Sequence, residues 1–333
     1  MDVNQTQQLF FNHIKSKLPL HLSFVDEVAE LLNISNDSAY RRIRGEKPIG
    51  LDEVQILCNK YKVSLDQLLQ IQSDTVIFSG NKVDNVFYSF KQYLQEVIGD
   101  NLQLFKILKN PHVYYFNKDI PIFHYMQFPE LMAFKFFFWK RSLLGYPEMA
   151  RLQFTGGETD AETAAAAKRI TDLYIQIPST EIWNEENVNC TIRQIEYYRQ
   201  SNIFADNTMV LKVYSQLEDL LNHLESQAEA GKKFLVNHSP NTNGASYNVY
   251  INECILGNNT VFVQSDERNI TFLNHNGLNM LATQDKLFCD YTVKNLQNII
   301  TKSTQVSIAG EKERSMFFNY LRSKIYEKKK AII

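Results

Sequence analysis

Cysteine is scarce in this chain of 333 residues, and the four cysteines are scattered at positions 58, 190, 254 and 289. They form no CxxC pair and no spacing typical of a metal site, which favours buried thiols in a reducing compartment. The most apolar run, residues 131–139, is interrupted by Lys135 and is too short to cross a membrane. The first residues, MDVNQTQQ, are polar and lack the apolar character of a secretory signal. We therefore expect a cytoplasmic protein with no membrane partner.

An excess of charge of one sign is also absent, and so are familiar catalytic motifs. The 35 basic and 37 acidic side chains give a formal net charge of −2, so the chain as a whole is no polyelectrolyte. The seven histidines are dispersed, and no HExxH, GxSxG or Walker motif occurs. We expect no catalytic residue, no metal site and no bound cofactor, and hence no enzyme.

Residues 23–69 contain a succession of short amphipathic helical patterns. Ser23, with Asp26 three residues later, resembles a capping box at the start of the first helix. Asn33 suits the left-handed conformation that ends a helix. Ser35 is placed to cap the helix that follows. These signals predict two short helices separated by a tight turn.

The second of these helices, residues 36–44, has two distinct faces at roughly 100 degrees of rotation per residue. Ala39 and Ile43 fall together and should face the core, while Arg42 falls on the flank. The opposite face holds polar and aromatic side chains, with Ser38 at its edge: Asp37, Ser38, Tyr40, Arg41 and Arg44.

A short helix of this kind can enter the major groove of DNA. Arg41 and Arg44 could bond a guanine edge or clamp phosphates, and Asn36 could contact an adenine or a phosphate. Tyr40 could donate to a phosphate or touch a thymine methyl. Asp37 could accept from cytosine or pair with Arg41 at i,i+4 and orient it, which we favour. The expected DNA-contacting residues are Ser23, Ser35, Asn36, Asp37, Ser38, Tyr40, Arg41, Arg44 and Lys47.

The segment with SAYRRIRGEKP after the turn resembles the helix-turn-helix of phage-repressor-like regulators (Cro/C1, Xre type). The resemblance covers about 50 to 65 residues, roughly a fifth of the chain. The glycine that ends the family's recognition helix matches Gly45, and its closing helix pair matches residues 51–62 and 64–69. Arg42 stands where the family usually has an apolar residue, so we expect different core contacts there. The resemblance implies a five-helix DNA-binding domain.

Helical periods dominate the middle of the chain, after an expected linker around residues 70–82. Two segments, 112–117 and 120–127, look extended. Beyond a loop-like stretch at 231–246 the period changes to two. Strands are expected there at 246–252, 259–264, 269–274 and 306–310. A hairpin turn that starts at Gly257 is expected to join the first two.

The chain as a whole is expected to have a mainly α fold of three parts. They are an N-terminal five-helix helix-turn-helix domain (1–72), a mainly helical middle region for dimerisation or scaffolding (83–230), and a small C-terminal α+β module for sensing or dimerisation (231–333).

These features together predict a sequence-specific DNA-binding transcriptional regulator whose partner is double-stranded DNA. Residues 36–47 hold four basic and two acidic side chains, a patch that binds weakly alone, so we expect a homodimer. The C-terminal region leaves room for a small-molecule or protein effector. The alternatives are a protein–protein adaptor with a helix-turn-helix-like head and a DNA-targeted enzyme.

Overall fold

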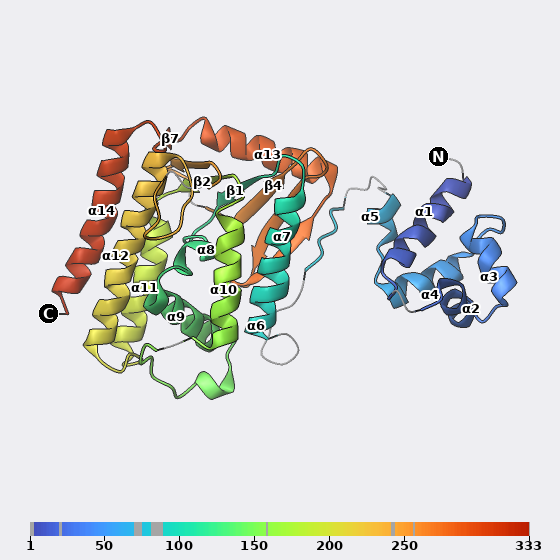
Figure 1. Cartoon of the computed structure of the whole chain (residues 1–333), viewed down its shortest axis with the longest axis horizontal. Helices are drawn as coiled ribbons and strands as arrows, with labels where there is room; N and C mark the ends of the chain where they lie inside the picture. The colour runs from blue at the N-terminus through green and yellow to red at the C-terminus, as the bar shows by residue number, and fades with distance from the viewer. Residues whose placement is uncertain are drawn as a thin grey trace. The chain divides into compact units, whose positions relative to one another are not determined.

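A computed structural model of the chain divides between Ile77 and Phe78 into two compact units, which are described one at a time (Figure 1). Of the linker expected at 70–82, the structure describes only residues 75–80. Ser79 already belongs to the second unit, where it pairs with Ala282. The described residues are 3–19, 22–69, 75–80, 89–157, 159–240, 244–255 and 257–332, without the side chains of Val3, Asn4 and Gln67.

In the described part of the first unit, five helices surround one small apolar core. Helices this short are marginal in water, so burial of their apolar faces must stabilise them. Phe11, Ile14, Val28, Ala39 and Leu57 are buried in that core. The helices are α1 (Val3–Ser16), α2 (Phe24–Leu32), α3 (Asn36–Ile43), α4 (Leu51–Tyr61) and α5 (Leu65–Leu69).

The local signals around the turn between α2 and α3 behave largely as the sequence predicts. Asn33 adopts the left-handed conformation with φ 52°, and the Ser35 side chain accepts a hydrogen bond from the Ser38 amide. Gly45 ends α3 with φ 82°, a conformation that costs little only without a Cβ. Ser23 stands at the N-cap of α2, but its side chain makes no capping hydrogen bond.

The second unit is built on a seven-stranded mixed sheet with the order β6-β5-β4-β1-β2-β3-β7. The central strands β1, β2 and β3 run parallel, and the flanking pairs are antiparallel. The strands are β1 (His112–Phe116), β2 (Ser179–Trp183), β3 (Tyr247–Ile251), β4 (Thr260–Gln264), β5 (Ile270–His275), β6 (Asn279–Thr283) and β7 (Thr304–Gln305).

This sheet corrects the expected fold class. The expectation of a mainly α chain, with a helical middle region and a separate small α+β module, is wrong, because β1 and β2 share one sheet with strands beyond residue 246. The hairpin expected at Gly257 is wrong too: β3 pairs with β2 and β7, and β4 pairs with β1 and β5. Residues 120–127 contain a helical turn rather than a strand, and β7 ends before the strand expected at 306–310.

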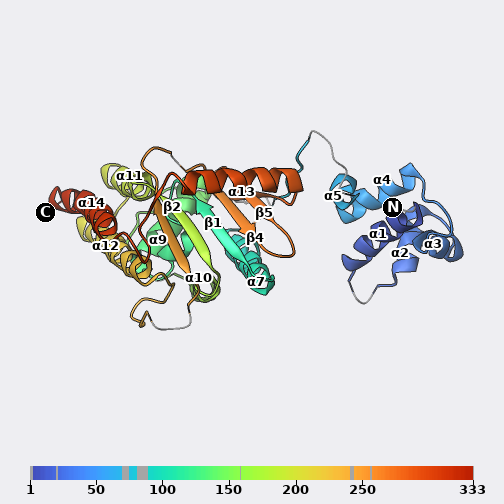
Figure 2. The ribbon, with the colours of Figure 1, turned by 90° about the horizontal axis from the view of Figure 1, so that it is seen from above.

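Helices cover both faces of the sheet. Figure 2 shows α13 on one face and α7 and α10 on the other. Helices α12 and α14 lie side by side at one end of the sheet (Figure 1). The helical segments are α6 (Phe90–Gln92), α7 (Asp100–Ile107), α8 (Ile122–Tyr125), α9 (Pro129–Phe138), α10 (Ala161–Tyr174), α11 (Glu186–Gln200), α12 (Asn207–Ala230), α13 (Lys286–Ile300) and α14 (Glu311–Lys330), with π-helical turns at Tyr93–Gly99 and Trp139–Leu143 and a 3-10 turn at Pro147–Met149.

The alternation of side chains along β1 explains how two cores form on opposite faces of one sheet. Val113 and Tyr115 belong to an apolar cluster that includes residues of α7 and α10. Phe116 belongs to a smaller cluster, together with Cys289 and Leu296 of α13.

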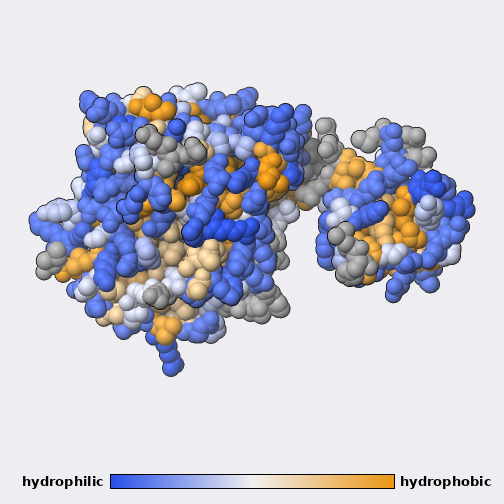
Figure 3. All heavy atoms as spheres, viewed as in Figure 1, coloured by the Kyte–Doolittle hydropathy of each residue, from blue (hydrophilic) through white to orange (hydrophobic). Residues whose placement is uncertain are grey.

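Among the described residues, no helix is long and apolar enough to cross a bilayer. On the face seen in Figure 3, hydrophobic side chains form separate patches with hydrophilic ones between them.

A fully buried carboxylate lies inside the second unit at the middle of β2. Glu181 has no solvent exposure and accepts hydrogen bonds from four side chains. His124 Nε2 lies 2.9 Å from one carboxylate oxygen, which also accepts from the Tyr174 hydroxyl. Trp183 Nε1, at 2.8 Å, and the Tyr247 hydroxyl, at 3.0 Å, donate to the other oxygen. The group is therefore well satisfied despite its burial.

The partners of Glu181 keep it ionised. Burial by itself raises the pKa of Glu181, but attraction to His124 and the hydrogen bonds from His124 and Tyr174 outweigh burial and lower that pKa to about 2. A carboxyl group whose pKa falls on folding stabilises the folded state at pH values above its ordinary pKa of 4.5. That contribution is lost as the pH falls through about 2.

Replacing Glu181 with glutamine should lower the free energy of unfolding of the second unit at neutral pH by about 3 kcal/mol, since it removes one partner of a buried ionic contact. The deficit relative to wild type should shrink as the pH is lowered from 4.5 towards 2. Urea unfolding followed by tryptophan fluorescence measures this, because Trp139 and Trp183 both lie in the second unit. Glu148→Gln, at an exposed position, is the matched control. Equal stability of the two variants would contradict the assigned role.

Candidate nucleic-acid interface

Helix α3 presents an outward face and a core face, as its sequence pattern predicts. Ala39 has no solvent exposure and Ile43 is half-buried, and both belong to the apolar core of the first unit. Tyr40 is 48% exposed, and Arg41 and Arg44 are exposed beside it. An aromatic ring and two guanidinium groups therefore stand on the surface of one short helix.

Most of the remaining expected contact residues also lie on the surface of the first unit. Ser23, Ser35, Asp37 and Lys47 are exposed, and Ser38 is half-buried. No ion pair joins Asp37 to Arg41 in the part of the chain that the structure describes. The orienting pair that the sequence favoured is thus not formed in the unit as it stands.

The amide of Asn36 is exposed but already has a partner within the unit. Its Nδ2 donates to Asp26 Oδ1 of α2 at 2.8 Å. This bond ties the start of α3 to the first turn of α2. A nucleic-acid contact by Asn36 through this nitrogen would have to replace or share the bond.

Arg44 lies against two neighbours that hold it only weakly. Its guanidinium carbon is 5.5 Å from the centre of the Tyr40 ring, and its Nε is 3.4 Å from Glu46 Oε1. Both partners of the ion pair are about half exposed, and such surface pairs contribute little, about 0–1 kcal/mol. A phosphate or a guanine edge could therefore replace Glu46 at small cost.

Arg42 is buried although it is charged, and its charge is paired within the first unit. Its Nε and Nη2 donate to the two carboxylate oxygens of Glu53 in α4 at 2.9 and 2.8 Å. Its Nη1 donates to the Ser38 carbonyl at 3.2 Å. The bidentate geometry fixes α3 to the start of α4. Of the four basic side chains at 36–47, Arg42 is therefore not available for a nucleic-acid contact.

Two glutamines of α1 hold the loop that follows α3. Gln7 Nε2 donates to the carbonyls of Arg42 and Lys47 at 2.7 and 2.8 Å, and its Oε1 accepts from the Ile49 amide. Gln8 Nε2 donates to the Arg44 carbonyl at 2.9 Å. Sequence reasoning missed these positioning residues because they act across 35 to 42 positions and no local pattern marks them.

The described residues include no group of three or more histidine, cysteine, aspartate or glutamate side chains placed to hold a metal ion. Two histidines of the second unit have partners in the sheet: His124 Nε2 lies against Glu181, and His112 Nε2 is 2.8 Å from Thr180 Oγ1. Burial, with a smaller effect of Lys233, lowers the pKa of His112 to about 4.

Comparison of the chain with protein-family models, with curated proteins and with solved structures gave no match.

The Arg42→Met variant should destabilise the first unit by about 1–3 kcal/mol, because it leaves the half-buried Glu53 carboxylate without its charged donor. The Arg42 hydrogen bond lowers the pKa of Glu53, so the pair's contribution is fully present above the ordinary value of 4.5 and is lost as the pH falls through the lowered value. Urea unfolding followed through backbone NMR signals of α3 and α4 measures the effect. Arg41→Met, an exposed control, should change stability by less than about 0.5 kcal/mol. A deficit in Arg42→Met that does not shrink in acid would refute the ionic assignment.

Proposed function

We propose that this chain is a sequence-specific DNA-binding transcriptional regulator whose first unit places α3 in the major groove. The single observation that supports this most is the outward face of α3, where Tyr40, Arg41 and Arg44 are exposed while Ala39 is buried. Arginine forks match a guanine edge or a pair of phosphates, and tyrosine can donate to a phosphate.

The charge around α3 favours action as a pair. With Arg42 held by Glu53, the exposed charges at 36–47 are Arg41, Arg44 and Lys47 against Asp37 and Glu46, an excess of one positive charge. Affinity from counterion release grows with the number of phosphates neutralised, so one copy binds weakly. We therefore propose a homodimer that contacts two half-sites, as the sequence predicted. A regulator of this kind acts in the cytoplasm.

An adaptor is the second candidate, and exposed apolar side chains of α4 favour it. Leu51 is 85% exposed and Ile56 is 43% exposed. Such residues suit a protein partner more than a polyanion. A partner held by this face would bind with little dependence on salt, whereas DNA binding falls steeply as salt is raised.

Replacing both Arg41 and Arg44 with alanine should cost at least ~2 kcal/mol of affinity for the preferred DNA site, at roughly 1–3 kcal/mol per good base contact. Selection from randomised duplex DNA by the full chain, at two salt concentrations, first identifies that site. Enrichment of an inverted repeat is expected from a dimer. Fluorescence anisotropy with the selected duplex then compares wild type and variant.

The matched control is Lys15→Ala/Lys60→Ala, which removes two exposed positive charges from other helices of the same unit. It should weaken binding to all duplexes slightly while the preference for the selected site is kept. Equal losses in the two double variants would reject α3 as the contacting face. Absence of any enriched sequence at either salt concentration, with both units folded, would favour the adaptor.

A further inference from the structure

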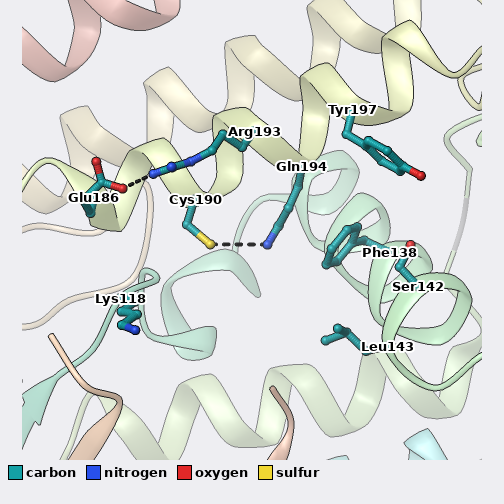
Figure 4. Close-up of a pocket in the computed structure, with 9 residues that line it drawn as sticks. All are labelled: Lys118, Phe138, Ser142, Leu143, Glu186, Cys190, Arg193, Gln194 and Tyr197. Carbon is teal, nitrogen blue, oxygen red and sulfur yellow. Dashed lines mark hydrogen bonds and ion pairs between the residues drawn. The ribbon is translucent and has the colours of Figure 1, made fainter. Parts of the chain in front are cut away.

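An open cavity of about 780 Å³ lies in the second unit at the carboxyl ends of two parallel strands (Figure 4). Lys118 follows β1 by two residues, and Glu186 begins α11 directly after the turn that follows β2. Because β1 and β2 run parallel, their carboxyl ends meet at one edge of the sheet. Open α/β sheets commonly bind ligands in the crevice outside this edge.

The two longer walls of the cavity come from α11 and from the end of α9. Figure 4 shows Cys190, Gln194 and Tyr197 along one side of α11, facing Phe138 and the turn that follows it. That turn, Trp139–Leu143, is π-helical: the Leu144 amide bonds to the Trp139 carbonyl five residues back. π-helical turns inside α-helices occur frequently at functional sites. Here the turn supplies Ser142 and Leu143 to the cavity.

A buried charge fixes the orientation of Gln194 in the α11 wall. Lys135 has no solvent exposure, and its Nζ donates to Gln194 Oε1 at 2.8 Å and to Asp119 Oδ2 at 2.7 Å. The hydroxyl of Tyr125 donates to the other oxygen of Asp119 at 2.5 Å. With its oxygen held by Lys135, Gln194 directs its Nε2 towards Cys190 Sγ, 3.5 Å away. This wall is thus ordered before any ligand enters.

The charges at the rim favour an anionic ligand. Arg193 forms an ion pair with Glu186, and no described residue forms an ion pair with the exposed ammonium group of Lys118. The three side chains together leave one positive charge. Burial, and to a smaller extent Asp119, raises the pKa of the Cys190 thiol to about 12, so it adds no charge at neutral pH and is a poor nucleophile.

The apolar part of the lining and the size of the cavity limit the ligand further. Phe138 and Leu143 face the cavity from one side, and Tyr197, which is 63% exposed, from the other. Cavities that hold small molecules span roughly 300–1,000 Å³ and are mostly apolar with a few placed polar groups.

We infer that this cavity binds a small organic anion. Its acidic oxygens contact Lys118 and Arg193, and its aromatic or aliphatic body lies against Phe138, Leu143 and Tyr197. This inference concerns binding by the second unit alone and is independent of the proposed DNA contact.

The test uses the full chain and the fluorescent probe 8-anilinonaphthalene-1-sulfonate, which joins one sulfonate to an apolar aromatic body. Titration should give one saturable site. Lys118→Glu should weaken that site at least about tenfold, since a charged donor is replaced by a repelling carboxylate. Lys294→Glu, the same change at an exposed position on α13, should leave it unchanged. N-phenyl-1-naphthylamine, a probe without the sulfonate, should bind more weakly and be insensitive to Lys118→Glu.

A second variant tests the contribution of the cavity itself separately from that of the charge at its rim. Ser142→Trp fills the space beside the π-helical turn and should abolish binding of both probes, with circular dichroism as the check on folding. If this variant fails to fold, Lys118→Glu still tests the inference. Its folding should be unaffected, because the lysine is exposed and makes no ion pair with a described residue. Absence of saturable binding, or equal affinity of wild type and Lys118→Glu for the sulfonate probe, would overturn the inference.

Discussion

The ionised carboxylate of Glu181 imposes the main constraint on the second unit, because its donors come from separate elements that must all be in place at once. His124 lies on α8, Tyr174 on α10 and Tyr247 on β3, so one side chain of β2 fixes two helices and a strand around it. Lys233 adds to this arrangement: its buried Nζ donates to the Ile177 carbonyl at 2.7 Å, just after α10. Burial lowers the pKa of Lys233 to about 7, against the attraction of Glu181, which acts to raise it. Burial of this charge is tolerated only when all of its donors are in place, because an unpaired buried charge is strongly destabilising. Glu181 therefore favours one specific fold as well as stabilising it.

A buried charged side chain with several hydrogen-bond partners also lies beside each candidate site. Arg42 and Glu53 join α3 to α4, and Lys135 and Asp119 hold the Gln194 wall of the cavity. In each pair the cation is nearly or fully buried and donates to more than one acceptor. Removal of either partner would leave an uncompensated charge, so neither the helix face nor the cavity wall can shift without loss of a strong contact. Rigid support of this kind is what a binding surface needs to keep its side chains in one geometry.

How far the sequence predicts each unit depends on whether its signals are local. In the first unit the signals act within one or two helical turns: the left-handed Asn33, the cap Ser35 and the helical spacing of core-facing residues around Ala39. The helices and the exposed face of α3 can be predicted from them. In the second unit the sequence does not indicate β2, because a buried strand with glutamate and serine does not have an apolar pattern, and two of the four donors to its glutamate lie 57 and 66 positions away. The false hairpin at Gly257 has a similar cause: β3 pairs with β2, which lies more than sixty residues earlier. The cavity could not be predicted either, since its walls combine residues 118, 138–143 and 186–197.

The contrast between paired and unpaired cations indicates where binding can occur. Arg42 and Lys135 donate their hydrogen bonds inside the protein, and an external anion could reach them only by displacing the half-buried carboxylate of Glu53 or Asp119. Arg41 and Lys118 are exposed and form no ion pair with any residue that the structure describes. An exposed cation gains most from an anion that brings several oxygens in fixed positions, as a phosphate backbone or an organic acid does. The paired, buried cations therefore fix the geometry, and the exposed cations beside them remain available for a ligand in each unit.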